Sequence, residues 1–555
     1  MGVVRPLLSS CLSWRLCGVR SATTCVFGRP RGPVHCIGAV ASWNSEAAAK
    51  PGTAKRRLRV CVVGSGPAGF YATKYLLKEE EKLLRGVEVD ILDRLPTPFG
   101  LVRYGVAPDH QEVKAVQSDF EEVASDPRVH FFGNVCLGQD VSAAQLSELY
   151  DVVILAYGAA GDRKLTVPGA HLEGVFAARA FVSWYNGHPE FAYMTENFRA
   201  ALDSSDTVAV VGVGNVALDC ARILAKGADA LRATDICDHT LQVLSSAGSS
   251  LRRVVVLGRR GHVQASFTIK ELRELTKLDD VRCLVRKDEL EMGRTTASYD
   301  ELKGNRPKTR IDALLTKVAE ESDGVGVGVV ANDEKAVELR FLVGLSEVLP
   351  SDTEPARVGA VRIERNRLEF DEATRSQHAV GSGDKDEVIE CGMVLGSIGY
   401  RCLPVKGVPY DQRRSIIAND GGRVPGVKGM YCSGWARRGP SGIIGSNIAD
   451  ARSVVSAIVE DVRGGQLELS RSKSTPTGGR QGLLRLLRGG RDSGSKSSES
   501  ENSQGVQVVD WNGYRGIDRE EVTRGKLKGK PREKLVDIRK MLEVAGASTA
   551  PLLEA

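Results

Sequence analysis

The stretch Val60-Cys61-Val62-Val63-Gly64-Ser65-Gly66-Pro67-Ala68-Gly69 decides the fold of this chain. An apolar strand is expected at residues 60–63, and a helix over residues 69–78 follows the three glycines. Gly64 permits a tight turn, Gly66 lets the backbone approach a pyrophosphate, and Gly69 allows close helix–strand packing. The next expected strand, residues 87–92, ends at Asp93, which is placed to accept hydrogen bonds from an adenosine ribose. The pattern predicts a dinucleotide-binding unit with its phosphates at the helix start.

A second glycine turn follows the apolar strand Val208–Val211, in the sequence Gly212-Val213-Gly214-Asn215-Val216-Ala217. The strand after it, residues 254–257, ends at Gly258-Arg259-Arg260-Gly261 instead of at an acidic residue. A carboxylate there would repel a 2′-phosphate, whereas paired guanidiniums can grip one. The second unit is therefore predicted to bind NADP(H) rather than NAD(H), and two different dinucleotides in one chain suggest electron transfer between them.

Strands that alternate with helices predict parallel sheets covered on both faces, so we expect an α/β fold with two Rossmann-like dinucleotide-binding domains. The first domain is expected in two parts, 58–165 and 391–465, and the second at 166–390. The polar, charged residues 286–335 are expected to be exposed and partly irregular. A flexible Ser/Gly/Arg-rich insertion is expected at 466–505, and a tail over 506–550 that packs back on the body.

The N-terminus, residues 1–50, is expected to be a disordered transit peptide. Residues 1–45 contain five arginines and no acidic residue, a composition typical of organelle import. We expect a protein of the mitochondrial matrix, with a plastid as the alternative. No apolar run approaches ~18 residues, so no transmembrane segment is expected. A net charge of +6 and 5% aromatic residues, without basic–aromatic interleaving, argue against nucleic-acid binding.

The twelve cysteines form no recognisable centre, because no two are separated by two residues and none has zinc or iron–sulfur spacing. Cys61 and Cys220 are expected to be small buried hydrophobes inside the nucleotide-binding units. We therefore expect no dithiol and no metal. His110 is expected to be a hydrogen-bonded structural residue. No catalytic side chain is assigned, because hydride and electron transfer belong to the cofactor.

A third informative stretch runs from Gly429 to Gly445 and contains Trp435. It predicts a strand, a loop, and then a helix from about Gly442 to Val459. A helix start beneath a flavin would stabilise the negative charge that develops on reduction.

Several long motifs closely resemble the adrenodoxin reductase family, the mitochondrial-type ferredoxin–NADP⁺ reductases. They are Pro98–His110, Gly212–Asp219, Gly258–Leu272, Trp435–Ile444 and Gly529–Asp537. The resemblance spans roughly residues 58–545, apart from the 466–505 insertion and parts of 320–390, and it implies a glutathione-reductase-like flavoprotein architecture. It also implies NADPH:ferredoxin oxidoreductase activity. A hydride would pass from NADPH to N5 of FAD, and two electrons would leave singly to an acidic [2Fe–2S] ferredoxin that feeds iron–sulfur assembly, haem or monooxygenase pathways.

The resemblance also carries residue assignments. FAD would contact Gly64, Gly66, Pro67, Ala68, Gly69, Asp93, Leu101, Val135, Trp435, Gly442, Ile443 and Ile444. NADP would contact Val213, Gly214, Asn215, Val216, Arg259, Arg260, Glu271 and Gly442, and a side chain at Gly442 would block stacking between flavin and nicotinamide. The basic candidates for ferredoxin docking are Arg273, Arg306, Lys308 and Arg310. The protein is expected to be a monomer, with peripheral attachment to the inner membrane.

Two other functions are compatible with the sequence. One is an NADPH-dependent flavin monooxygenase or dehydrogenase acting on a small molecule. The other is a catalytically silent flavoprotein that serves as a scaffold.

Overall fold

The computed structural model describes residues 57–83, 86–322, 334–384, 386–467, 478–489 and 505–546. The predicted transit peptide lies outside these ranges.

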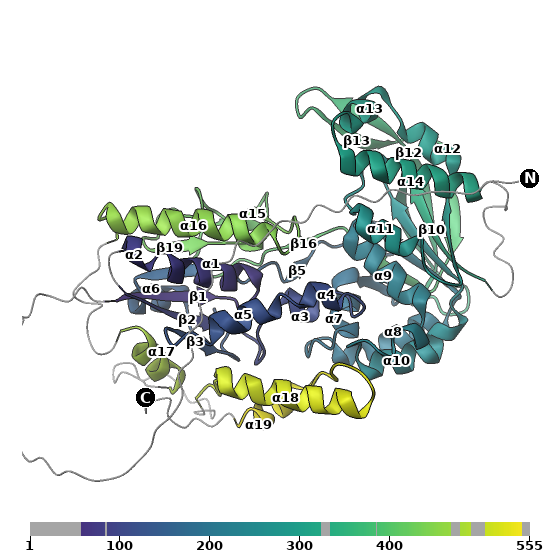
Figure 1. The fold of residues 1–555 in the computed structure, drawn as a ribbon. Coiled ribbons are helices and arrows are strands. Elements are labelled where there is room, and N and C mark those ends of the chain that lie inside the picture. The colour runs from purple at the N-terminus through teal and green to yellow at the C-terminus, as the bar shows by residue number, and fades with distance from the viewer. Residues whose placement is uncertain are drawn as a thin grey trace, which may run out of the picture. The chain divides into compact units, whose positions relative to one another are not determined.

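The first sheet contains, within the described chain, five parallel strands in the order β3-β2-β1-β4-β19 (Figure 1). Their bounds are β1 Leu58–Val63, β2 Val87–Leu92, β3 Val129–Phe132, β4 Val152–Leu155 and β19 Met430–Cys432. Val60 and Val62 pack into a core with helices α1 (Pro67–Lys78), α5 (Gln117–Ala124) and α16 (Ser446–Arg463). Cys61 and Val63 pack into the opposite core with α6 (Ala143–Leu149). Because successive side chains alternate between faces, a strand buried on both faces must be continuously apolar.

The second sheet contains, in the same described ranges, six parallel strands in the order β6-β15-β7-β8-β10-β9. Their bounds are β6 Val175–Ala177, β7 Thr207–Val211, β8 Arg253–Gly258, β9 Val281–Val285, β10 Lys335–Phe341 and β15 Met393–Gly396. One face packs on α7 (Ala178–Tyr185) and α9 (Asn215–Lys226). The other face packs on antiparallel strands rather than helices: β11 Val343–Pro350, β12 Val358–Asp371 and β14 Glu387–Glu390. Strand β13 (Ser376–Gly381) extends β12 as a hairpin.

The chain leaves the first sheet after β4, builds the second, and returns to the first sheet at β19. The strand order 3-2-1-4-5 of the first sheet is that of a dinucleotide-binding fold, in which ligands bind at the carboxyl ends of the strands.

The prediction of exposed, partly irregular structure at 286–335 is wrong for most of that range. It forms α12 (Lys287–Gly293), α13 (Thr296–Leu302) and α14 (Arg306–Ser322). Helix α14 buries Ile311, Leu315, Val318 and Ala319, a stripe at helical spacing that its many charged residues obscure in the sequence.

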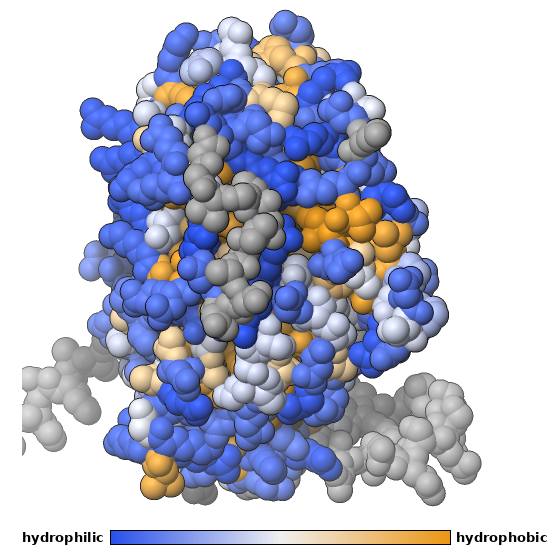
Figure 2. Space-filling view, turned by 90° about the vertical axis from the view of Figure 1, so that its right-hand side faces the viewer, coloured by the Kyte–Doolittle hydropathy of each residue, from blue (hydrophilic) through white to orange (hydrophobic). Residues whose placement is uncertain are grey.

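Polar side chains cover most of the molecular face shown in Figure 2, and apolar ones gather mainly in a patch at mid-height.

The expectation of a flexible insertion at 466–505 is wrong for residues 478–489. Helix α17 (Arg480–Leu487) buries Leu483, Leu484 and Leu487 in the core beside α6, and Arg480 pairs with the buried Asp90 of β2 at 3.0 Å. So short a helix is not stable alone in water, and tertiary packing stabilises it here.

The C-terminal residues form α18 (Trp511–Leu527) and α19 (Ile538–Val544). Helix α18 places Tyr514 and Ile517 in the core that Val60 and Val62 share with α1, α5 and α16. The loop that follows α18 reaches Asp238 at the start of α10 (Asp238–Ser245). Within the described chain, no helix combines the length and apolar character needed to cross a membrane.

Candidate functional site

The first glycine turn has the geometry of a phosphate cradle. Gly64 has φ +108°, and a Cβ atom there would lie 2.5 Å from the carbonyl oxygen of Ala156. A Cβ on Gly69 would lie 2.0 Å from the carbonyl oxygen of Gly64, so helix and strand touch at this glycine. A Cβ on Gly66 would meet no heavy atom of the described chain within 4 Å. Pro67 and Ala68 begin α1 beside this open space, which leaves room for an anion at the helix start.

Asp93 lies at the end of β2, facing the turn. Its Oδ2 accepts hydrogen bonds from the Ser65 amide (3.0 Å) and hydroxyl (2.5 Å), and its Oδ1 accepts one from the Leu95 amide (3.0 Å). A carboxylate has about four acceptor positions, so one remains for a ribose. The buried Val135 donates its amide proton to the Asp93 carbonyl oxygen (2.8 Å), which places Val135 beside the ribose position.

Two further segments border the first turn. The amide of Phe99 donates to the Ser65 carbonyl oxygen (2.9 Å), and Leu101 follows with 37% of its surface exposed. From the other side, a Cβ on Gly434 would lie 2.4 Å from Cβ of Ala68. The turn therefore lies between the Phe99–Leu101 segment and the end of β19.

The helix predicted from Gly442 begins at Ser446 instead, as α16. Gly442 has φ +82°, a left-handed conformation that cannot continue into a right-handed helix, and the Ser446 hydroxyl accepts the Ile443 amide at 3.0 Å. Trp435 is half-buried and donates from Nε1 to the Ser441 carbonyl oxygen (3.2 Å). Ile443 is 65% exposed, and the half-buried Ile444 packs on the core between the first sheet and helix α1.

The second turn has glycines at its first two positions, as the first turn does, but Ala217 at the third. Gly212 has φ +124°, and a Cβ on Gly214 would meet no described heavy atom within 4 Å. The carbonyl oxygen of Val213 accepts the Ser266 amide (2.9 Å), and Oδ1 of Asn215 accepts the Thr268 amide (2.8 Å). The Thr268 hydroxyl donates a hydrogen bond to the Glu271 carboxyl, and burial raises the pKa of that carboxyl. Val216 lies in the first turn of α9, so the predicted NADP residues Val213–Val216 and Glu271 come together here.

Arg259 and Arg260 follow β8. Their carbonyl oxygens are fixed, that of Arg259 by the Asn366 side chain (3.1 Å) and that of Arg260 by the Leu342 amide (3.1 Å). Arg259 is exposed and Arg260 half-buried. Neither guanidinium has a carboxylate of the described chain within the 4.0 Å of an ion pair. Two unpaired guanidiniums on an anchored backbone form a suitable site for a phosphate.

Comparisons with known proteins agree with this geometry. The family model described as pyridine nucleotide-disulphide oxidoreductase matches residues 58–343. The mitochondrial NADPH:adrenodoxin oxidoreductase of Salvelinus fontinalis is 43% identical, over 88% of this chain and 91% of that protein. The chain belongs to the adrenodoxin reductase family. The human NADPH:adrenodoxin oxidoreductase is 41% identical (89% and 93% covered), and the NADPH-ferredoxin reductase FprA of Mycobacterium tuberculosis is 36% identical (87% and 98%). A structure of FprA with NADPH superimposes with a TM-score of 0.76 at 34% identity, covering 88% of this chain and all of FprA.

The sequence of the present chain contains no Cys-x-x-Cys spacing, which a redox dithiol would require. Cys61 and Cys220 are fully buried, and burial raises the pKa of both thiols. His110 hydrogen-bonds Glu274 at 2.6 Å.

The docking candidates lie on two helices that pack against each other. Arg273, on α11 (Ile269–Leu275), is exposed and borders a cavity of about 640 Å³ that is also lined by Asp109, His110, Lys226, Lys270 and Lys277. Arg306 and Arg310 are exposed at the start of α14, where Lys308 pairs with Glu301 at 2.6 Å.

Some neighbours of the site have no sequence signal of their own. Asp450 of α16 accepts the Gly434 amide and pairs with Arg437 (2.8 Å). Glu521, more than 400 positions along the chain from Arg103, pairs with it beside Leu101. A partner as distant in sequence as Glu521 could be recognised only through the fold.

Proposed function

We propose that this protein is an NADPH:ferredoxin oxidoreductase. The observation that carries the proposal is the pair of unlike nucleotide turns, one ending at Asp93 and the other at the unpaired Arg259 and Arg260. The chain's membership of the adrenodoxin reductase family supports the same activity.

The first turn fits FAD. The open space above Gly66, the α1 N-terminus and the remaining acceptor position of Asp93 would hold the pyrophosphate and ribose. Val135 would border the adenosine, while Leu101, Trp435 and residues 442–444 would border the flavin. When bound, FAD supplies the conversion of a two-electron hydride donor into single electrons for an iron–sulfur protein.

The second turn fits NADPH. Gly214, Asn215 and Val216 would receive the pyrophosphate at the start of α9, with Val213 beside it and Glu271 in the first turn of the adjoining helix α11. Arg259 and Arg260 would grip the 2′-phosphate, and Gly442 would leave room for the nicotinamide. The chain's own work is to bind and orient the two nucleotides, which lowers the entropic part of the barrier to hydride transfer.

The partner is an iron–sulfur ferredoxin, and we propose an acidic [2Fe–2S] protein. Arg273 and Lys277 are exposed cations beside a cavity of mixed charge, in which Lys270 pairs with Glu112 at 2.7 Å. They would attract such a partner, and Arg306, Lys308 and Arg310 would extend this surface along α14. We further propose a monomer in the mitochondrial matrix, with peripheral attachment to the inner membrane. The names of the relatives favour the mitochondrion over a plastid.

Anaerobic mixing tests the activity and the docking surface together. NADPH should bleach the flavin absorbance, and a [2Fe–2S] ferredoxin should restore it, more slowly as ionic strength rises. Arg273→Ala should slow the second phase about threefold and flatten its salt response. Arg539→Ala, which removes an exposed charge from α19, is the matched control. Flavin that NADPH does not bleach would overturn the activity, and a salt-independent second phase would overturn the docking surface.

A further inference from the structure

The segment that precedes Leu101 has a strained backbone at a buried residue. Phe99 is fully buried and has φ +81°, a conformation that a non-glycine residue rarely adopts. The next residue, Gly100, approaches the first glycine turn so closely that a Cβ on it would lie 3.2 Å from Cα of Gly66. Strain of this kind persists where the surroundings over-determine the conformation, often beside functional sites.

Part of those surroundings comes from the C-terminal helix. The Phe99 ring packs edge-on against Tyr514 (centroids 5.6 Å apart) and Trp511 (6.3 Å), both on α18, and it also contacts Phe70 of α1 (5.6 Å). Helix α18 thus packs on Phe99, while the neighbouring Gly100 faces Gly66.

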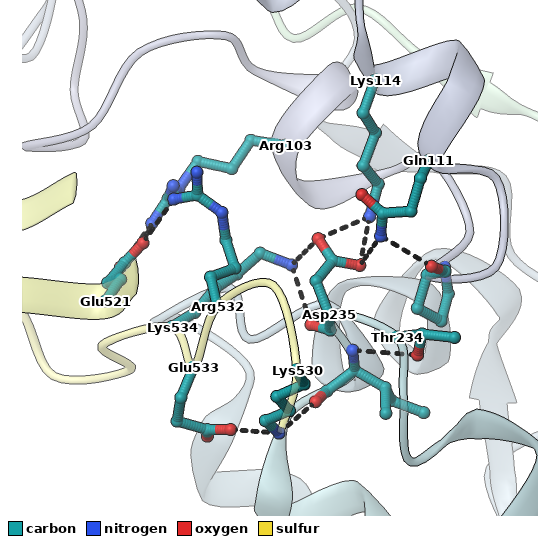
Figure 3. A network of polar contacts seen from close by, with 12 residues as sticks. Arg103, Gln111, Lys114, Thr234, Asp235, Glu521, Lys530, Arg532, Glu533 and Lys534 are labelled. Carbon is teal, nitrogen blue, oxygen red and sulfur yellow. Dashed lines mark hydrogen bonds and ion pairs between the residues drawn. The ribbon is translucent and has the colours of Figure 1, made fainter. Parts of the chain in front are cut away.

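A buried ion pair fixes the same segment two residues after Leu101. Arg103 is on the one-turn helix α3 (Leu101–Tyr104), and its Nη2 lies 2.5 and 2.7 Å from the two carboxylate oxygens of Glu521 (Figure 3). The side chains are 1% and 0% exposed. Glu521 also accepts the Leu535 amide (2.9 Å) and pairs with Arg532 (3.1 Å), so its position is fixed independently of Arg103.

We propose that Glu521 is a positioning residue for the FAD site: by holding Arg103, it sets the Phe99–Leu101 segment against the first glycine turn. The proposal rests on the proposed function for the identity of the ligand. A four-residue helix cannot hold its own orientation. A buried guanidinium without its carboxylate is costly, so removing Glu521 would drive Arg103 towards water and shift Leu101 with it.

A second buried contact fixes the far end of this stretch. Beyond Arg103, Lys114 and Gln111 of α4 (Gln111–Lys114) bind Asp235, which also pairs with Lys534 of the C-terminal segment at 3.1 Å (Figure 3). Asp235 therefore holds the Lys114 end of the Phe99–Lys114 stretch, and Glu521 holds the end nearer the glycine turn.

The test compares two neighbouring glutamates of α18 in the holoenzyme. Glu521→Gln keeps the shape and removes the charge, and we expect FAD to dissociate about tenfold more readily, measured by the recovery of free-flavin fluorescence. Glu520→Gln, at the exposed pair with Arg524 (2.8 Å), is the matched control and should leave FAD affinity within about twofold. Glu521→Asp retains the charge and should restore part of the loss. The KM for NADPH should change less than about twofold in every variant, because the second turn is untouched.

Three outcomes distinguish the possibilities. A Glu521→Gln protein with a lower Tm but wild-type FAD affinity and visible spectrum would overturn the positioning role and leave a structural one. A wild-type protein that binds no FAD would overturn the proposed function instead. If Glu521→Gln does not fold, Glu521→Asp, which shortens the reach to Arg103 by one methylene, replaces it. About threefold weaker FAD binding is then expected, and unchanged binding would overturn the proposal.

Discussion

The turn at Gly64 and the turn at Gly212 have the same backbone design in different surroundings. The first is bordered by the Phe99–Leu101 segment, against which α18 packs, and Ser65 holds Asp93, the predicted ribose residue. The second is bordered by Ser266–Thr268 and the start of α11, and its Arg259 is exposed. In both turns the second glycine, Gly66 or Gly214, leaves open space at a helix start, where a phosphate is predicted to bind. The segments packed around each turn predict a retained FAD in one and an exchangeable NADPH in the other.

The third glycine position gives the largest expected effect. Gly69 has the Gly64 carbonyl oxygen where its Cβ would be, whereas the second turn has Ala217, already fully buried, at the same position. Gly69→Ala should therefore lower the free energy of unfolding by about 3 kcal/mol or more and release FAD. Ala217→Gly should cost only about 1 kcal/mol, through helix propensity. Denaturant unfolding and flavin content measure both. Full FAD retention in Gly69→Ala would show that the two turns pack alike.

The residues that follow the strand after each turn, Asp93 in the first unit and Arg259 and Arg260 in the second, give the next largest effect. Replacing Arg259 and Arg260 together with Ala removes the charge-assisted bonds to a 2′-phosphate, and the KM for NADPH should rise about 100-fold. The KM for NADH, which lacks that phosphate, should hardly change, and FAD content should stay at the wild-type value. Steady-state kinetics with both nucleotides is the measurement. Equal losses for NADPH and NADH would contradict the assignment of the pair to the 2′-phosphate.

The contact between the two nucleotide-binding regions gives a smaller, pH-dependent effect. Lys114 bonds to Asp235 at 2.6 Å, with Lys534, Arg532 and Gln111 close by. Burial and, second to it, the charge of Lys534 lower the pKa of Lys114 to about 7. The unfolded chain then holds more protons than the folded one between about pH 7 and pH 10, so the free energy of unfolding should rise with pH across that window.

Lys114→Met isolates this contribution. The wild-type protein should gain at most about 1.4 kcal/mol per pH unit from Lys114 between pH 7 and 9, and the variant should lose that slope. Urea unfolding at each pH measures it. Parallel pH profiles for the two proteins would mean that Lys114 titrates in the folded chain as it does in the unfolded one.

Local pattern was sufficient where function depends on neighbours in sequence. The glycine turns, the strands that lead into them, Asp93 and the Arg259–Arg260 pair all follow from short-range chemistry, and the structure places residues 213–216 beside Gly258 and Thr268. The pattern failed for α14 and α17, because a charged exposed face or a low-complexity context hid a short apolar stripe. It also placed the start of α16 too early, because the left-handed turn at Gly442 has no distinct signature.

The sequence by itself determined two glycine turns, one followed by Asp93 and the other by Arg259 and Arg260, and from these residues it predicts different ribose chemistry. A turn and the residue that ends the next strand are set by backbone sterics and side-chain charge, which are local properties. The tertiary structure alone decided what borders each turn. Phe99 keeps its strained conformation because α18, hundreds of residues later, packs behind it, and Arg103 is buried because Glu521 meets it. Such contacts depend on where distant segments meet in the fold, and no local spacing encodes that meeting.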